Sequence, residues 1–199
     1  MAGIRDVQRA ETRQQILQAG LQLVRQSGFG KTTTGEIAKL VGKAHGTVFV
    51  HFANRDALVI ELVKAIGTGL TEQLAHLSRG SAGLGAFLDA HLAVLADQEA
   101  LYSALLQEMS VLPASARAYV MAMQSGVSAR LGHALQADID SGAARPLDTV
   151  AVTNIWIALT NHYLLNRDLF APGESVIARH GQMLKSQLLT IVGREGAHD

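Results

Sequence analysis

The fold of this 199-residue chain is set by residues 29–58, which read FGKTTTGEIAKLVGKAHGTVFVHFANRDAL. Within them, Thr33 and Glu36 have the spacing of a capping box, in which a hydroxyl and a carboxylate each satisfy a backbone amide of the other residue. A short helix is therefore predicted to follow at 34–41. Its buried side is expected to consist of Ile37, Ala38 and Leu40.

A second short helix is predicted at 44–52, after a turn that Gly42 permits because glycine tolerates a left-handed backbone. Val48 and Phe52 lie four residues apart and are expected to hold this helix onto its neighbours. The residues then expected to point outward are Ala44, His45, Thr47, Val50 and His51. An exposed helix of this length, braced by two others, fits the major groove of DNA. The same spacing is also compatible with an ordinary three-helix core that has a polar surface.

The rest of the chain is also predicted to be helical. Apolar residues recur at helical spacing almost everywhere, and alternating apolar and polar runs are absent. The expected helices cover residues 9–27, 34–41, 44–52, 55–77, 84–96, 98–111, 114–140, 148–170 and 175–193. This gives an all-α chain of about nine helices. We expect a helix-turn-helix domain at 1–54 and a second helical domain at 55–199.

Composition excludes several function classes. The chain has no cysteine, which removes thiolate metal sites, disulfides and cysteine nucleophiles. It shows no secretory signal and no apolar run long enough to cross a bilayer, so a cytoplasmic location is expected. Residues 1–55 hold eight Lys and Arg against three Asp and Glu, whereas the remainder has an acidic excess. This asymmetry favours a polyanionic partner for the N-terminal part alone, although a chance imbalance remains open.

Enzymatic motifs are missing from the sequence. There is no His-Glu-x-x-His, no set of two Glu-x-x-His motifs as in di-iron bundles, no Gly-x-Ser-x-Gly elbow and no phosphate-binding glycine loop. Glu72 and His76 are four residues apart on one helix, which supplies one edge of a metal site but not a site. The chain is therefore not expected to be an enzyme or to use a metal or cofactor.

Residues 29–58 resemble the signature of the TetR (tetracycline-repressor-like) family. The matching elements are, in order, Phe29, Thr33-Thr34, Ile37-Ala38, Gly42, Gly46-Thr47-Val48-Phe49, Phe52 and Arg55-Asp56-Ala57-Leu58. The resemblance covers the first 60 residues. It implies a regulator, most simply a repressor, that binds a palindromic double-stranded DNA operator as a dimer.

The resemblance implies a set of DNA-contacting residues. It places Thr33 and Thr34 against phosphate, His45, Gly46 and Thr47 near bases and backbone, and Arg55 on a phosphate. The full set is Thr33, Thr34, Lys43, Ala44, His45, Gly46, Thr47, Phe49, His51 and Arg55.

Four positions depart from the usual family pattern. Gly35 lacks a side chain where some members read a base, Phe49 lacks the hydroxyl of the usual tyrosine, His45 replaces a common lysine, and Lys43 replaces an apolar residue. Lys43 either loosens the packing of the turn or adds a phosphate contact. The departures at Gly35, His45 and Phe49 keep open an alternative, a protein-interaction module that retains the fold but has lost sequence-specific DNA binding.

The helices at 148–170 and 175–193 are expected to form a homodimer. On the first, Val150, Asn154, Ile157, Asn161 and Leu164 form one face, while Ala151, Ile155, Ala158, His162 and Leu165 form another. A helix that is apolar on two sides is buried on two sides, and pairing with a symmetry mate as a four-helix bundle achieves this. Burial within a monomer is the remaining alternative.

A small-molecule effector site is expected among the other helices, as is usual in the family. Its candidate lining residues are Phe87, His91, Tyr102, Leu106, Met109, Met121, Trp156 and His162. Methionine and aromatic side chains adapt to apolar or amphipathic ligands, and His, Tyr and Trp add directional hydrogen bonds. Taken singly, a Met or Tyr at helical spacing is usually part of the core, so the case for this site comes from the family resemblance.

Overall fold

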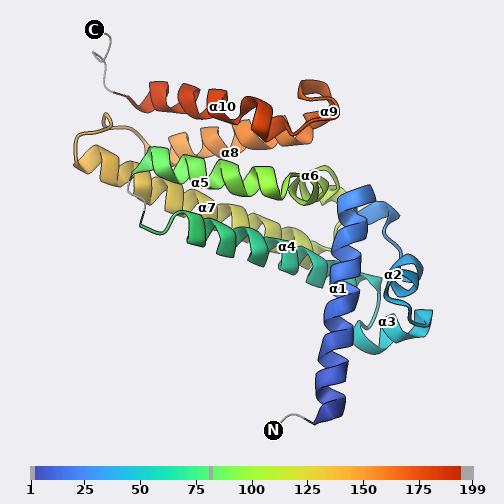
Figure 1. Ribbon diagram of the computed structural model, residues 1–199. Coiled ribbons are helices and arrows are strands. Elements are labelled where there is room, and N and C mark those ends of the chain that lie inside the picture. Colours follow the sequence, from blue (N-terminus) through green and yellow to red (C-terminus); the bar gives the residue numbers. More distant parts are fainter. Residues whose placement is uncertain (1–2, 81–82, 194–199) are drawn as a thin grey trace. The chain divides into compact units, whose positions relative to one another are not determined.

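The computed structural model describes residues 3–80 and 83–193, and every regular element in that part of the chain is a helix (Figure 1). The α-helices are α1 (Ile4–Lys31), α2 (Thr34–Val41), α3 (His45–His51), α4 (Arg55–Leu77), α5 (Leu84–Asp97), α6 (Glu99–Gln107), α7 (Ala114–Asp140), α8 (Thr149–Leu165), α9 (Arg167–Phe170) and α10 (Val176–Val192). A short 3-10 helix, η1 (Met109–Val111), lies between α6 and α7. The predicted all-α class is confirmed.

Two of the predicted helices are interrupted, and the first predicted helix has a further turn beyond its expected end. Gly28, whose φ is 80°, ends the regular part of α1 where the sequence predicted, and a further helical turn then runs to Lys31. The predicted helix 98–111 divides at Glu108 into α6 and η1. The predicted helix 148–170 divides at Asn166, where the backbone leaves helical geometry before α9 begins.

The helices gather into two compact units. One comprises the chain up to Thr68 together with Ala100–Val120, and the other comprises Gly69–Glu99 together with the chain from Met121 onward. The expected functional boundary between residues 54 and 55 stays a prediction.

The first unit has a core that draws on α1, α2, α3 and α4. Its buried side chains include Ile16, Phe29, Ile37, Val48, Phe52, Leu58 and Leu62. Gly20 of α1 permits close packing, since a Cβ atom there would lie 2.7 Å from a methyl carbon of Leu62. One prediction for this core was wrong: Leu40 is 48% exposed, because α2 is short and buries only Ile37 and Ala38.

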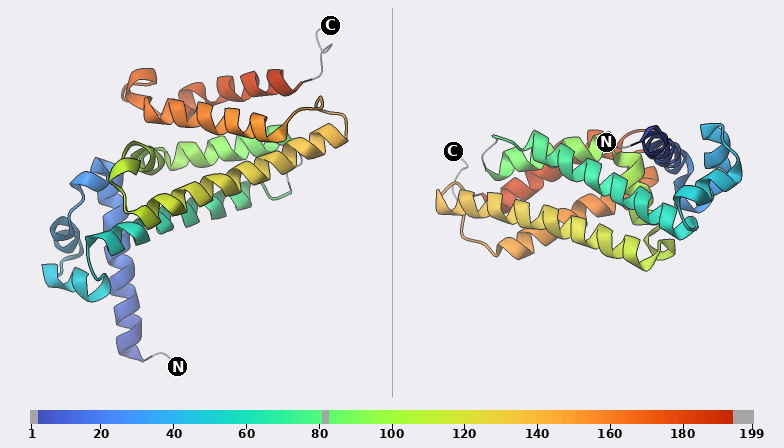
Figure 2. Two further views of the ribbon diagram at one scale, coloured as in Figure 1. Left: turned by 180° about the vertical axis from the view of Figure 1, so that it is seen from behind. Right: turned by 90° about the horizontal axis from the view of Figure 1, so that it is seen from below.

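In the second unit, α10 packs against both α5 and α8, which the views of Figures 1 and 2 show lying alongside it. One predicted face of α8 is not the buried one, since Val150 is 65% exposed and Asn154 is also exposed. That face was predicted to consist of Val150, Asn154, Ile157, Asn161 and Leu164. The residues that α8 buries are instead Val152, Thr153, Trp156, Thr160 and Leu164. Among the described residues, no helix is long and apolar enough to cross a membrane.

Candidate nucleic-acid interface

The start of α2 is fixed by the predicted capping box. The Glu36 amide donates to the Thr33 hydroxyl at 3.2 Å, and the Thr33 amide donates to the Glu36 carboxylate at 3.1 Å. The Thr33 hydroxyl also donates to that carboxylate, at 2.8 Å. Both hydrogen-bonding functions of this hydroxyl are therefore engaged in holding α2, so any contact of Thr33 with a phosphate would compete with the cap.

The turn between α2 and α3 is made by Gly42, whose φ of 69° places it in the left-handed region. The next amide, of Lys43, donates to the Ala38 carbonyl at 2.9 Å and closes the end of α2. Val48 and Phe52 then anchor α3, being 1% and 3% exposed. The helix-turn-helix geometry predicted from these spacings is confirmed.

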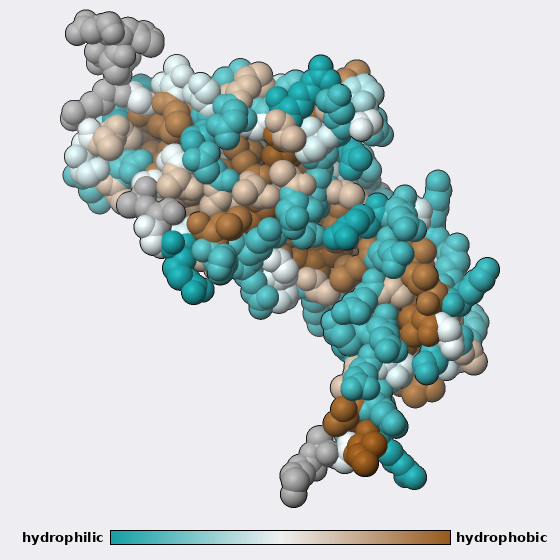
Figure 3. All heavy atoms as spheres, in the orientation of Figure 1, coloured by the Kyte–Doolittle hydropathy of each residue, from teal (hydrophilic) through white to brown (hydrophobic). Residues whose placement is uncertain are grey.

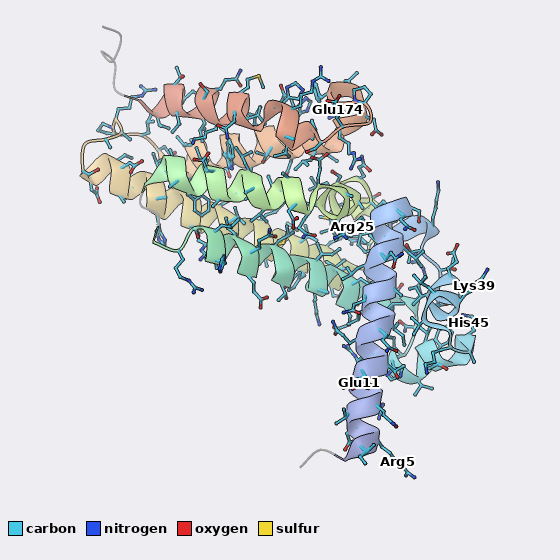
Figure 4. All side chains as sticks on the ribbon, in the orientation of Figure 1. Arg5, Glu11, Arg25, Lys39, His45 and Glu174 are labelled. Carbon is cyan, nitrogen blue, oxygen red and sulfur yellow. The ribbon has the colours of Figure 1, made fainter. Side chains whose placement is uncertain are left out.

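The outer side of α3 carries the predicted DNA-contacting residues. Ala44, His45, Gly46, Phe49 and Val50 are exposed, while Thr47 and His51 are half-buried. Figure 4 shows Lys39 of α2 and His45 of α3 on the side of this helix pair that faces away from α1. The surface that would enter a groove is therefore free within this unit.

Two of these residues are paired with each other across the turn. The Thr34 hydroxyl and Nε2 of His45 lie 2.8 Å apart, and the His45 ring meets the edge of Phe49 with centroids 5.3 Å apart. The pairing orders the first turn of α3. Since one hydrogen is shared between them, the hydroxyl and a neutral imidazole keep one donor for an external oxygen acceptor.

His51, at the end of α3, faces basic residues of α1. A cavity of about 300 Å³ lies between them, lined by Asp6, Arg9, Ala10, Arg13 and His51. Burial, and secondarily the charges of Arg9 and Arg13, lowers the pKa of His51 below its usual value, so its ring is neutral at pH 7. Hydrophilic residues predominate over the face of α1 visible in Figure 3. In the sequence, Arg9 and Arg13 contributed only to the basic excess of residues 1–55, and no site was predicted for them.

Arg55 is exposed, yet its guanidinium is also bonded within the protein. One guanidinium nitrogen donates to the Phe29 carbonyl at 2.7 Å, and the adjacent Asn54 caps α4 by accepting from the Ala57 amide at 2.8 Å. A guanidinium has five N–H donors, so this bond leaves others for a phosphate. Arg55 thus joins the end of α1 to the start of α4 in addition to its predicted role.

The sequence of this region matches a family model. Residues 16–62 match the model described as "Bacterial regulatory proteins, tetR family". Over these residues the chain is of the tetR family type. The matched family is one of regulatory proteins, which agrees with the expectation that the chain is not an enzyme.

Curated relatives match this chain over part of their length. The HTH-type transcriptional regulator TtgR of Pseudomonas putida is 38% identical over 71 residues, which are 36% of this chain and 32% of that protein. The HTH-type transcriptional regulator AcrR of Shigella flexneri is 42% identical over 52 residues, or 26% of this chain and 24% of that protein. The matches therefore span about a third or less of these relatives.

Solved structures of transcriptional regulators share the fold over nearly the whole chain. A putative transcriptional regulator from Saccharomonospora viridis, solved in complex with choline, aligns with a TM-score of 0.82 and 14% identity over 94% of this chain and 100% of that one. The regulator FadR from Bacillus subtilis, in complex with stearoyl-CoA, aligns with a TM-score of 0.73 and 19% identity over 89% and 97% of the two chains. At these identities the likeness concerns the fold.

The predicted effector residues fall in three places. Phe87 and His91 of α5 lie beside Trp156 of α8: the Phe87 and His91 rings stack with centroids 6.4 Å apart, and the Trp156 indole N–H donates to Nδ1 of His91 at 3.0 Å. Tyr102, Leu106 and Met109 belong to α6 and η1 in the other unit. Met121 is 62% exposed on α7 and His162 is exposed on α8, so neither lies against the first group.

Two features that sequence reasoning missed lie near these residues. Ser103 of α6 is 2% exposed, and its hydroxyl has no hydrogen-bond partner within the described part of the protein. In the second unit, a cavity of about 320 Å³ is lined by Ser78, Gly83, Phe87, Arg130, His133 and Ala134. Arg130 and His133 lie three residues apart on α7, a spacing that puts them on one face, but a basic pair on a helix is too common a pattern to signal a pocket. Across residues 3–80 and 83–193, no group of three or more metal-ligating side chains comes together.

Proposed function

We propose that the protein is a ligand-responsive transcriptional repressor that binds a palindromic operator as a homodimer and leaves it when a small apolar or amphipathic effector binds. The observation that carries this proposal is the exposed outer side of α3, with His45, Phe49 and Val50 exposed while Val48 and Phe52 lock the helix in place. A rigidly held, solvent-facing recognition helix is what major-groove binding needs. The basic excess of residues 1–55 supplies attraction to phosphate.

The dimer is supported by an uncharged stripe on α8. Its residues follow helical spacing and are all exposed in the single chain: Ala151, Ile155, Ala158, His162 and Leu165. The stripe contains no Asp, Glu, Lys or Arg, and Ile155 and Leu165 each leave more than 40% of their surface open. Small and apolar residues in this register suit close packing of α8 and α10 against a second copy.

The cavity of the second unit and the structural relatives support the proposal that an effector binds. The cavity beside Phe87 combines an aromatic wall with the polar groups of Ser78, Arg130 and His133, a combination suited to an amphipathic ligand. Two proteins of the same fold were solved with choline and with stearoyl-CoA, respectively. Release follows if effector and operator favour different spacings of the two recognition helices, and a coupling of about 1–3 kcal/mol changes DNA affinity about 5–150-fold.

Salt titration of Lys43→Ala tests the DNA-binding part of this proposal. Lys43 is exposed in the turn before α3, so we expect it to contact a phosphate. Each lost phosphate contact lowers the slope of log Kd against log salt by about 0.9, and a dimer should lose about 1.8. The measurement is fluorescence anisotropy with duplexes selected by the wild-type protein from a random library and with the region upstream of its own gene.

Arg79→Ala is the matched control, since it removes an exposed cation outside the helix-turn-helix and should leave the slope unchanged. Failure of the wild-type protein to select any duplex at low salt would refute DNA binding and favour the alternative, a protein-interaction module. An effector screen in which every active compound strengthens the DNA complex would refute release by effector.

A further inference from the structure

The chain turns from α1 into α2 at residues 28–33, called the corner below, and a carboxylate from the segment after α6 binds this corner. Glu108 is half-buried, and its two oxygens accept separately from the amides of Phe29, at 2.9 Å, and Gly30, at 2.6 Å. From the other direction, Arg55 donates to the carbonyl of the same Phe29 at 2.7 Å. Both polar backbone atoms of Phe29 are thus bonded to side chains that lie far from it in sequence, while its ring is buried.

At Gly28 the backbone of the corner comes so close to the Glu108 carboxylate that there is no room for a side chain. The φ of Gly28 is 80°, and a Cβ atom at this position would collide with Oε1 of Glu108. The absence of a side chain therefore serves both the left-handed backbone and the close approach of Glu108. The corner continues through Thr32, whose hydroxyl donates to the Gly28 carbonyl at 2.7 Å, directly to Thr33, the residue that caps α2.

We propose that Glu108 is a positioning residue for DNA binding, which fixes the origin of α2 and, through it, the orientation of α3; the proposal rests on the DNA-binding function above. Hydrogen bonds to charged acceptors are the stronger class, and two of them meet the peptide segment that enters the helix-turn-helix. Glu108 lies outside residues 29–58, so no local motif identifies it. Its partners are brought together only by the tertiary fold.

Whether Glu108→Gln binds DNA more weakly or more tightly than wild type distinguishes a positioning role of the carboxylate from a purely electrostatic one. Neutralising an acid in a DNA-binding unit reduces repulsion of phosphate, so a purely electrostatic role predicts tighter binding for Glu108→Gln. Positioning predicts weaker binding, because glutamine keeps one acceptor oxygen and turns an NH₂ group toward a backbone amide. The slope of log Kd against log salt should stay unchanged, since no phosphate contact is lost.

The experiment compares full-length wild type, Glu108→Gln and Glu108→Ala on a duplex selected by the wild-type protein, at several salt concentrations. Amide hydrogen exchange at Phe29 and Gly30 is followed in the same samples. The control is Glu11→Gln, which neutralises an exposed acid of α1 away from the corner (Figure 4).

For Glu108→Gln we expect affinity about tenfold weaker at every salt concentration, together with faster exchange at the two amides. Glu11→Gln should bind as tightly as wild type or more tightly. Equal or tighter binding by Glu108→Gln would overturn the proposal even where exchange accelerates, because the carboxylate would then be a local structural contact only. If Glu108→Ala fails to fold, Glu108→Gln still decides. Absence of any binding by wild type would instead refute the proposed function itself, and the positioning role with it.

Discussion

Replacing Ala158 with aspartate is expected to split the dimer and to weaken operator binding by about 10²–10⁴-fold. Ala158 lies at the middle of the uncharged stripe of α8 and is exposed in the single chain, so the carboxylate costs the subunit little. In the proposed dimer it would be buried without a partner and close to its own symmetry copy, which is strongly unfavourable. A monomer can engage only one half of the palindrome, and the gain from binding both halves at once is lost.

Sedimentation equilibrium and anisotropy on the same samples measure the two effects. The matched control is Ala122→Asp, which places the same charge at an exposed alanine of α7 and should leave both the dimer and its affinity intact. A dimeric Ala158→Asp would place the interface elsewhere. A monomeric variant with undiminished affinity would show that the dimer is not needed for operator binding.

The sequence predicted the helix-turn-helix closely because its determinants are local. The capping box at Thr33 and Glu36, the left-handed Gly42 and the Asn54 cap each act over two to four residues, and each has the expected geometry. Short-range spacing of this kind can be read without knowledge of the tertiary fold. Leu40 was the exception, since whether its face of α2 is covered depends on neighbours that the spacing does not name.

Contacts between distant segments could not be predicted. Glu99, at the start of α6, is 6% exposed and accepts from the Ser175 hydroxyl and from the amides of Val176 and Ile177, so it caps α10 across more than 70 residues of sequence. Glu108 acts similarly on the end of α1. An acid near a helix terminus is too common to point to such a partner. The candidate effector residues lie in three separate places for the same reason, because helical spacing identifies the faces of helices but not which faces meet; their role stays a prediction.

The pairing of His91 with Trp156 has a consequence for acid stability. His91 is 6% exposed, and burial lowers its pKa to about 4. Its Nδ1 accepts the indole N–H of the fully buried Trp156, which requires that nitrogen to be unprotonated. Protonation would therefore place a charge in the core and replace an acceptor with a donor facing a donor.

Stability should consequently fall as the pH is lowered from about 6.5 to about 4. In this window His91 is protonated in the unfolded state but not in the folded state, so the free energy of unfolding decreases as the pH falls. Below pH 4 His91 is protonated in both states, and its contribution to the decrease ends. A difference of about 2.5 pKa units corresponds to about 3 kcal/mol. His91→Phe should remove that part of the pH dependence, although at pH 7 it costs about 1–3 kcal/mol because the indole N–H loses its acceptor.

Urea unfolding at fixed protein concentration, from pH 7.5 to pH 4, measures this difference. His51 also has a lowered pKa, but its contribution is common to wild type and His91→Phe and cancels when the two are subtracted. His76→Gln, which changes an exposed histidine of α4, should retain the wild-type pH profile. The double variant His91→Phe with Trp156→Phe removes the orphaned donor and should recover part of the stability at pH 7 while keeping the flatter profile. Parallel curves for wild type and His91→Phe would mean that His91 takes up its proton in the folded core as readily as in water, and that the indole is not bonded to Nδ1.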